Sequence, residues 1–141
     1  MQDNQIDRIR SGLQFYDYVV NKVEFYANEH HDGSDVNLTF RLQREIKYLD
    51  HDHIMHVTLH AYVFEGAVEN NYPFEINVSV TGFFKISPDL FEDKDSLATT
   101  NAVAILFPYV RSLVTTFTGN ANVNPLILPT VNVVKMIEMD I

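Results

Sequence analysis

The feature of this sequence that most constrains its fold is a change of hydrophobic period after Ile86. Before that residue, apolar side chains occupy alternate positions over long stretches, which is typical of strands that bury one face. After it, they recur at the spacing of a helix that packs against other structure. Strands in the first half of the chain and a helix in the second half predict an α+β fold.

Two strands are clearest in this pattern. From Val36 to Tyr48, apolar residues fall on most even positions and polar residues fill the odd ones. From Phe74 to Ile86 the pattern repeats, with Phe83 as the exception. Each stretch therefore predicts a long strand with one face in the core and the other in water.

Two further strands are expected. His53 to Glu65 is rich in β-branched and aromatic residues, and the turn residues of Gly66 to Pro73 predict a hairpin with the next strand. Leu13 to Phe25 is also strand-like, but Asp17 and Asn21 interrupt its odd-numbered apolar face. These interruptions predict a bend or a bulge in that strand.

A helix is predicted through residues 97–117, with Asp95 or Ser96 as its N-cap and Gly119 at its end. Pro108 predicts a bend within it. The apolar residues of this helix spread well beyond one stripe, which is typical of a helix that is covered on more than one side. Because one face of a small sheet cannot cover all of this surface, we expect a second subunit to supply the other cover.

Size and charge narrow the range of functions. At 141 residues the chain fits a single domain, taken as 1–141 with 1–11 as a flexible N-terminal extension. The formal net charge of −9 opposes binding to nucleic acid or to an anionic membrane. The longest apolar run, Ala102 to Val110, is too short to cross a bilayer, and the polar N-terminus predicts no signal peptide. We therefore expect a cytoplasmic protein without membrane insertion, which also suits a chain that has no cysteine.

Catalytic and metal-binding patterns are weak. His56 and His60 would share one side of a strand, yet at ~3.3 Å per residue they would lie too far apart for one metal ion. Asp50 to His53 indicates a solvated hairpin turn. The sequence has no glycine elbow, phosphate cradle or paired acid–base motif. We expect no enzyme activity, metal or cofactor, although a triad assembled from residues distant in sequence stays open.

The most specific stretch is Ala104 to Arg111, AILFPYVR, followed by the extended LPTVN of Leu128 to Asn132. Together they resemble the SecB family of export chaperones, whose corresponding helix carries ILFPYAR before a LAPVN loop. GFFKI at Gly82 to Ile86 is similar to the GIFSI of that family. The resemblance covers most of the chain, from about Val23 onward.

This resemblance implies a four-stranded antiparallel sheet with a long C-terminal helix packed on one face. It implies a homo-oligomer, either a tetramer built as a dimer of dimers or a dimer. The implied activity is that of an ATP-independent holdase, which binds unfolded or partly folded polypeptides in apolar grooves and keeps them competent for protein export. The alternative is a dedicated chaperone of one partner, such as an antitoxin, without an export role.

Residues for both kinds of contact follow from the resemblance and from the apolar pattern. The expected polypeptide-binding residues lie near the first crossover, on the late helix and in the loop beyond it: Val36, Leu38, Phe40, Val110, Leu113, Val114, Phe117, Leu126, Ile127 and Leu128. The expected oligomer interface lies on the same helix: Ala102, Ile105, Leu106 and Tyr109. Each of the polypeptide-binding residues also suits an ordinary core position.

Docking to the export motor SecA is doubtful in this chain. In the family, acidic positions on the exposed face of the sheet contact SecA. Here those positions hold Lys22, Tyr26 and Asn77, while Glu75 replaces an apolar residue. The acidic docking pattern is therefore not reproduced, and a role in export stays open.

Overall fold

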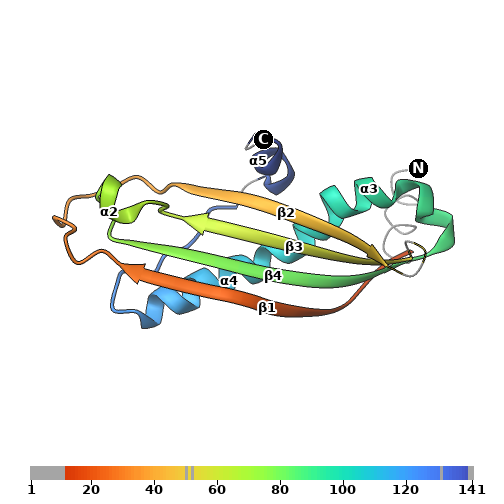
Figure 1. Ribbon diagram of the computed structural model, residues 1–141, viewed down its shortest axis with the longest axis horizontal. Helices are drawn as coiled ribbons and strands as arrows, with labels where there is room; N and C mark the ends of the chain where they lie inside the picture. Colours follow the sequence, from red (N-terminus) through yellow and green to blue (C-terminus); the bar gives the residue numbers. More distant parts are fainter. Residues whose placement is uncertain (1–11, 50, 52, 131, 140–141) are drawn as a thin grey trace.

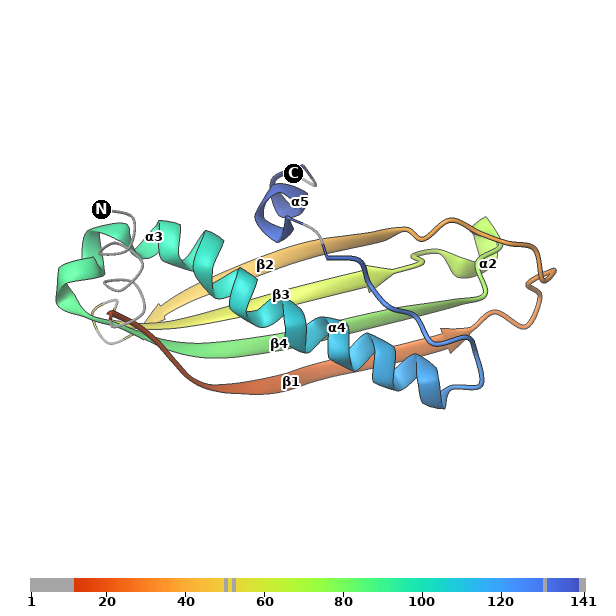
Figure 2. The same cartoon turned by 180° about the vertical axis from the view of Figure 1, so that it is seen from behind.

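The structure is a computed structural model that describes residues 12–49, 51, 53–130 and 132–139. Its centre is an antiparallel sheet in the order β1-β4-β3-β2, with β1 at Leu13–Ala27, β2 at Phe40–Leu49, β3 at Ile54–Val63 and β4 at Phe74–Ile86. A long helical stretch crosses one face of this sheet (Figures 1 and 2). The expected α+β architecture, a four-stranded antiparallel sheet with a long helix on one face, is confirmed. The extension expected at 1–11 lies outside the described residues.

The strand bounds follow the alternating pattern with one exception. In β3 every odd-numbered residue from Met55 to Val63 is buried, and β4 has the bounds that the sequence predicted. β2, however, begins at Phe40 and not at Val36. Phe40 pairs with the last residue of β3, and Phe64 then adopts a left-handed φ of 55° that turns the chain away. Residues 36–39 therefore lie beyond the end of the β2–β3 ladder.

The predicted irregularities of β1 are confirmed. Its register against β4 shifts between Phe15 and Asp17 and again between Val20 and Lys22. An extra residue in a strand reverses the face to which the following side chains point. Apolar side chains consequently appear on both faces of β1.

The helical layer begins earlier than the sequence predicted. Helical backbone runs through η1 (Pro88–Asp93, a 3-10 helix), α3 (Lys94–Ser96), η2 (Leu97–Ala102, a π-helix) and α4 (Val103–Asn120). Asp95 and Ser96 are thus inside it and cap nothing, and Asp95 instead accepts a hydrogen bond from the Tyr48 hydroxyl. The missed signal was Pro88, because the fixed φ of proline suits the first turn of a helix.

The helix continues through Pro108 and ends at Asn120. Gly119, the predicted end, lies in the last turn, and the left-handed residue beyond the helix is Asn122, at φ 59°. By length and composition alone the stretch 88–120 would suit a membrane span. A helix that packs its apolar side chains on a sheet has the same composition, so this feature by itself is weak evidence for a membrane.

The core lies between α4 and the even-numbered face of β4. Its largest fully buried members include residues of β2, β3, β4 and α4: Leu42, Met55, Leu59, Ile76, Phe84 and Leu106. Gly82 interrupts the apolar series at the centre of β4. A Cβ there would lie 2.6 Å from the Leu106 side chain, so glycine is what allows α4 to approach the sheet closely.

The chain then returns along the flank of α4 that faces away from β1. Residues 124–130 run extended beside the helix, and they lead to the short helix α5 (Val133–Met139), which contacts β2 and α4 (Figure 2). Val133 and Ile137 are buried there. On this flank the second cover of α4 is therefore supplied by the same chain and not by the expected second subunit. A second subunit on the other flank stays a prediction.

Candidate polypeptide-binding surface

The expected polypeptide-binding residues do not form a single surface. Val110, Val114 and Leu128 are fully buried. Five others are partly buried against the core: Val36, Leu38, Phe40, Leu113 and Leu126. Phe117 and Ile127 are exposed, with 40% and 67% of their surface accessible. In this conformation only the partly buried and the exposed residues have accessible surface that could contact another polypeptide.

One continuous apolar surface does lie between α4 and β1, and we call it the apolar strip. It consists of Ile105, Tyr109, Leu113 and Phe117 on α4, which recur every four residues, and of Tyr18, Val20, Val23 and Phe25 on β1. Ring contacts join its two sides: Tyr18 to Tyr109 at 4.5 Å between centroids and Phe25 to Phe117 at 5.4 Å. All members are partly buried or exposed, so the strip is open to solvent along its length.

Of the four expected oligomer-interface residues, two are accessible and two are buried. Ile105 and Tyr109 belong to the apolar strip and retain accessible surface. Ala102 and Leu106 are fully buried against their own sheet. Those two side chains therefore have no surface for a second subunit in this conformation, while contact through Ile105 and Tyr109 stays a prediction.

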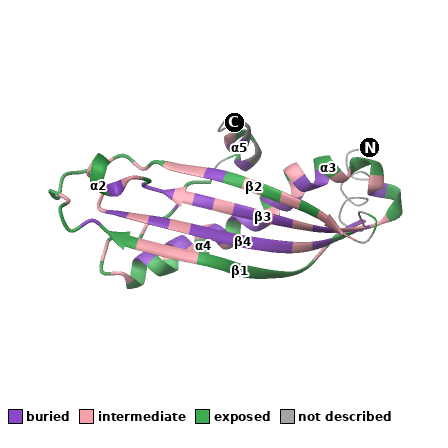
Figure 3. Ribbon diagram, viewed as in Figure 1, coloured by how far each residue is buried: buried purple, intermediate pink, exposed green. Residues whose placement is uncertain are grey.

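The strip continues onto the outer edge of β1, a feature that the sequence reasoning missed. β1 pairs only with β4 among the described strands, and Figure 3 shows most of β1 exposed, whereas β3 and β4 are mainly buried or intermediate. Tyr18 and Val20 are exposed on the helix side of the sheet, and Tyr16 and Val19 on the other side. The sequence did contain a signal for this exposed edge, namely the polar residues Asp17 and Asn21 in the first strand. They mark two bulges, and a bulge makes neighbouring apolar side chains point to opposite faces of the sheet.

An open cleft of about 690 Å³ lies where the strip ends, between the loop 31–36 and the turn 119–124. Val36, Pro73 and Val123 are its apolar lining, and His31, Ser34 and Asp35 are among its polar lining. Only Val36 among the expected residues borders it. Gly119 lines the cleft two residues beyond Phe117, so the cleft and the end of the strip lie at the same end of α4.

The loop at the cleft is held in place by polar contacts. His31 Nδ1 lies 2.9 Å from the carbonyl oxygen of Asn71, and the Asn71 side chain accepts a hydrogen bond from the Asp32 amide. Hydrogen bonds from Ser34 and Asn71 hold the pKa of Asp32 well below its ordinary value. Asp32 therefore stays ionised to a lower pH than an ordinary aspartate does.

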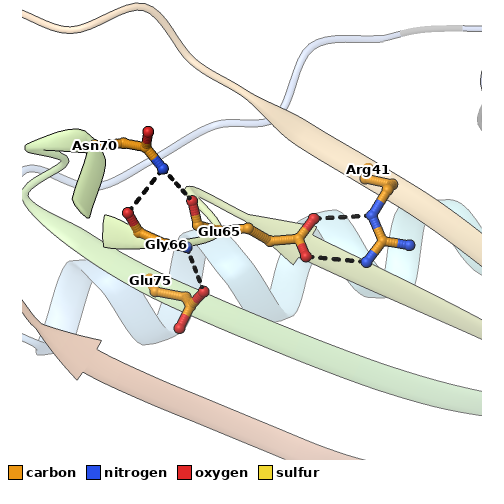
Figure 4. Close-up of polar contacts among 5 residues, drawn as sticks. All are labelled: Arg41, Glu65, Gly66, Asn70 and Glu75. Atoms are coloured by element: carbon orange, nitrogen blue, oxygen red, sulfur yellow. Dashed lines mark hydrogen bonds and ion pairs between the residues drawn. The ribbon is translucent and has the colours of Figure 1, made fainter. Parts of the chain in front are cut away.

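The opposite end of the β3–β4 connection is fixed by a network drawn in Figure 4. Arg41 donates two hydrogen bonds to the carboxylate of Glu65, at 2.8 and 3.0 Å, and this contact lowers the pKa of Glu65. Glu75 accepts the Gly66 amide at 3.0 Å, and the Asn70 side chain donates to the Gly66 carbonyl at 2.9 Å. The network orders the turn around helix α2 (Ala67–Asn70) and leaves no free cation in it.

The open face of the sheet carries the positions that the resemblance relates to SecA. Lys22 contacts Glu24 at 3.0 Å, and the Tyr26 hydroxyl donates to the same carboxylate at 2.6 Å. The charge of Glu24 is thus shared between two neighbours on its own strand. Glu75 is engaged by Gly66, so these positions do not form a free acidic patch.

Histidines and hydroxyls also meet on the open face. His60 Nδ1 lies 2.6 Å from Ser79 Oγ, and its Nε2 lies 3.5 Å from Glu45 Oε1. This is a nucleophile–base–carboxylate order, but Ser79 and His60 stand within paired strands, whose amides are used by the sheet and do not form an oxyanion hole. His56 packs on Phe83, and burial lowers its pKa. Within the described residues, no group of three or more His, Asp or Glu is arranged to hold a metal ion.

Comparisons with known proteins agree with this architecture. Residues 19–140 match the family model of SecB, described as preprotein translocase subunit SecB. The chain is 34% identical over 130 residues to the uncharacterized protein MJ0357 of Methanocaldococcus jannaschii, a match that covers 90% of this chain and 83% of that protein.

A solved structure is also similar in fold. It is the SecB-like chaperone Rv1957 of Mycobacterium tuberculosis, in complex with a ChAD peptide from the HigA1 antitoxin Rv1956. The TM-score is 0.63 with 19% sequence identity, and the alignment covers 89% of this chain and 94% of that chain. The family model spans most of the sheet, the whole of α4 and the segment beyond it, and on that match the chain belongs to the SecB family.

Proposed function

We propose that this protein is an ATP-independent holdase, which binds unfolded or partly folded polypeptides and keeps them from aggregating. The observation that carries the proposal is the apolar strip, an accessible row of aromatic and aliphatic side chains that ends at an open cleft. The proposal assigns the activity to the cytoplasm and involves no catalytic residue and no cofactor.

Such binding depends on the apolar area that is buried and on the number of contacts along the client. Each apolar group of a client contributes about 25 cal/mol per Å² removed from water. Affinity therefore grows with the length of unfolded chain laid along the surface, and sequence preference stays low. We assign the client to the end of the strip formed by Phe25, Leu113 and Phe117, together with the cleft beside Val36.

The other end of the strip suits a second copy of this chain. Tyr18, Val20, Ile105 and Tyr109 lie beside the unpaired edge of β1, where main-chain groups and apolar side chains are both accessible. An edge of this kind favours strand addition. The proposed assembly is a homodimer through β1, or a tetramer formed from two such dimers. The molecular mass in solution tests it, and a stable monomer at high concentration would contradict it.

The holdase activity is tested by the aggregation of an unrelated heat-denatured protein. Stoichiometric amounts of this protein should suppress that aggregation. Phe117→Lys, which places a charge on an exposed position of the client end, should weaken suppression severalfold. Val68→Lys is the matched control, because Val68 is exposed outside the strip. No protection by the wild-type protein at severalfold excess would overturn the proposal.

A second candidate is a dedicated chaperone of one partner protein, such as an antitoxin. Two observations favour it: the fold is shared with a SecB-like chaperone solved with an antitoxin peptide, and the open face presents no free acidic patch for SecA. Purification of the protein from its native cells decides between the two. One dominant partner supports the dedicated role, whereas many unrelated polypeptides support the general holdase.

A further inference from the structure

The flank of α4 opposite the apolar strip binds an extended stretch of the chain through that stretch's backbone. Arg111 Nε donates to the carbonyl of Leu128 at 2.9 Å, and Thr115 Oγ1 donates to the carbonyl of Leu126 at 2.9 Å. The Leu126 amide donates in turn to Thr118 Oγ1 at 2.9 Å. The three helical residues lie at spacings of four and three, so they form a row along one side of α4.

The bound stretch behaves as a short strand without a sheet. Leu128 is fully buried, Ile127 is 67% exposed and Leu126 is partly buried, so alternate side chains point toward α4. Pro125 and Pro129 bracket the three residues and keep them from becoming helical. Apart from the pocket for Leu128, the recognition uses main-chain atoms that any polypeptide possesses.

We propose that this flank, which we call the backbone-binding row (Arg111, Thr115 and Thr118), is a second polypeptide-binding site, and that residues 126–128 are an internal occupant that a client can replace. The client would be an extended segment with apolar side chains two residues apart. The inference rests on the proposed holdase function and names a further site for it.

The position of the row favours a client as the competing occupant. Asn122, Val123 and Asn124, which lead into the bound stretch, also line the cleft assigned to the client. A polypeptide that enters the cleft therefore meets the start of the internal occupant. Replacement costs no sheet hydrogen bonds among the described residues, because the hydrogen bonds of the stretch are made to side chains of α4.

The internal occupant has the advantage of being tethered. A tethered segment competes at an effective concentration on the order of millimolar, so a short free peptide should bind the wild-type protein poorly. Weakening the internal occupant should expose the row to the same peptide. This contrast makes the site testable in the full chain.

The probe is a fluorescent peptide with the sequence VNPLILPT, which reproduces residues 123–130. It is titrated against the full-length protein and against Leu128→Ala, with Ile127→Ala as the matched control on the exposed neighbour. Leu128→Ala should bind the peptide about tenfold more tightly than wild type, and Ile127→Ala should not differ from wild type. A peptide with aspartate in place of its last leucine should not bind. Equal affinities for all three proteins would overturn the proposal.

Two further variants separate the site from a general loosening of the fold. Arg111→Met added to Leu128→Ala removes one donor of the row and should reverse the gain in affinity; an unchanged gain would contradict the site. If circular dichroism shows that Leu128→Ala does not fold, Leu126→Ala replaces it as the variant that weakens the internal occupant, because Leu126 is only partly buried.

Aggregation suppression by the same preparations distinguishes the two proposals. If the wild type suppresses aggregation and neither leucine variant gains peptide binding, the backbone-binding row is refuted while the holdase function stands. If a variant gains binding and the wild type does not suppress aggregation, the site stands and the holdase function is refuted.

Discussion

The two edges of the sheet are built in opposite ways. On β2 the outward positions of the open face are Arg41, Gln43, Glu45 and Lys47, and its other face is covered in part by α5. On β1 the accessible side chains include Tyr16, Tyr18, Val19 and Val20. β2 spans ten residues, whereas β1 spans fifteen.

The difference shows which edge is protected and which is available. Charged side chains on a short, covered edge are the usual means by which proteins prevent a further strand from adding. The edge of β1 has bulges and a few charged residues such as Lys22, but it also exposes apolar groups on both faces and is therefore less protected. The contrast shows that β2 completes the core of its own subunit, and it supports the proposal that β1 binds another polypeptide.

The largest expected difference concerns stability. Leu42→Ala on β2 removes a fully buried side chain, and the lost contacts and cavity should cost about 2–5 kcal/mol of the free energy of unfolding. Val20→Ala on β1, at a position that is 43% exposed, should cost less than about 1 kcal/mol. Urea unfolding at low protein concentration measures both. Similar losses at the two positions would show that β1 is as much a part of the core as β2.

The next effect concerns self-association. Val20→Lys places a charge on the accessible apolar edge and should raise the dissociation constant of the oligomer at least about tenfold, or ~1.4 kcal/mol. Light scattering after size-exclusion chromatography reports the change in mass. The matched change Gln43→Lys on β2 should leave the mass as it is. An oligomer that responds to Gln43→Lys instead would assign association to the other edge.

A smaller difference in stability is expected when a tyrosine hydroxyl is removed from each edge. Tyr48→Phe on β2 removes a 2.5 Å hydrogen bond to Asp95 in the helical layer and should cost about 0.5–1.5 kcal/mol. Tyr26→Phe on β1 removes only a contact with Glu24 on the same strand and should leave the melting temperature unchanged. Thermal unfolding compares the two. If Tyr26→Phe lowers the melting temperature as much as Tyr48→Phe does, the two edges do not differ in this respect.

The smallest effect concerns pH. Arg41 lowers the pKa of Glu65 below its ordinary value of 4.5, so the stabilisation is present above that pH and is lost as pH falls through the folded-state pKa. Glu65→Gln should therefore be less stable than wild type at pH 7, by under about 1 kcal/mol because the pair is largely exposed, and equal to it at low pH. Melting temperatures at several pH values test this. A difference that persists at low pH would assign the effect to packing.

Much of the sheet could be predicted because its residues obey a local rule. The alternation from Phe74 to Ile86 defines β4 to the residue, and the polar interruptions of the first strand locate its bulges. The start of β2 could not be predicted from its own pattern. Val36 and Leu38 continue the alternation, but β3 has already ended opposite Phe40.

The candidate site was predicted less well for a related reason. Helical spacing identified all apolar residues of α4 without showing which lie against the sheet. Leu106 and Val110 are buried, whereas Tyr109 and Leu113 on the same helix are only partly buried. The β1 residues of the apolar strip, such as Val20, could not be predicted from the pattern of the helix, because they lie near the other end of the sequence.

The sequence by itself determined the periods of its elements, and with them the α+β class, the four strands, the helix and the likeness to the SecB family. The tertiary structure decided which apolar side chains remain accessible. That division depends on which strands are neighbours, on where their ladder ends and on which flank of α4 the returning chain covers. Local patterns record whether a side chain is apolar, but its exposure depends on residues that are distant in sequence and meet only in the folded chain.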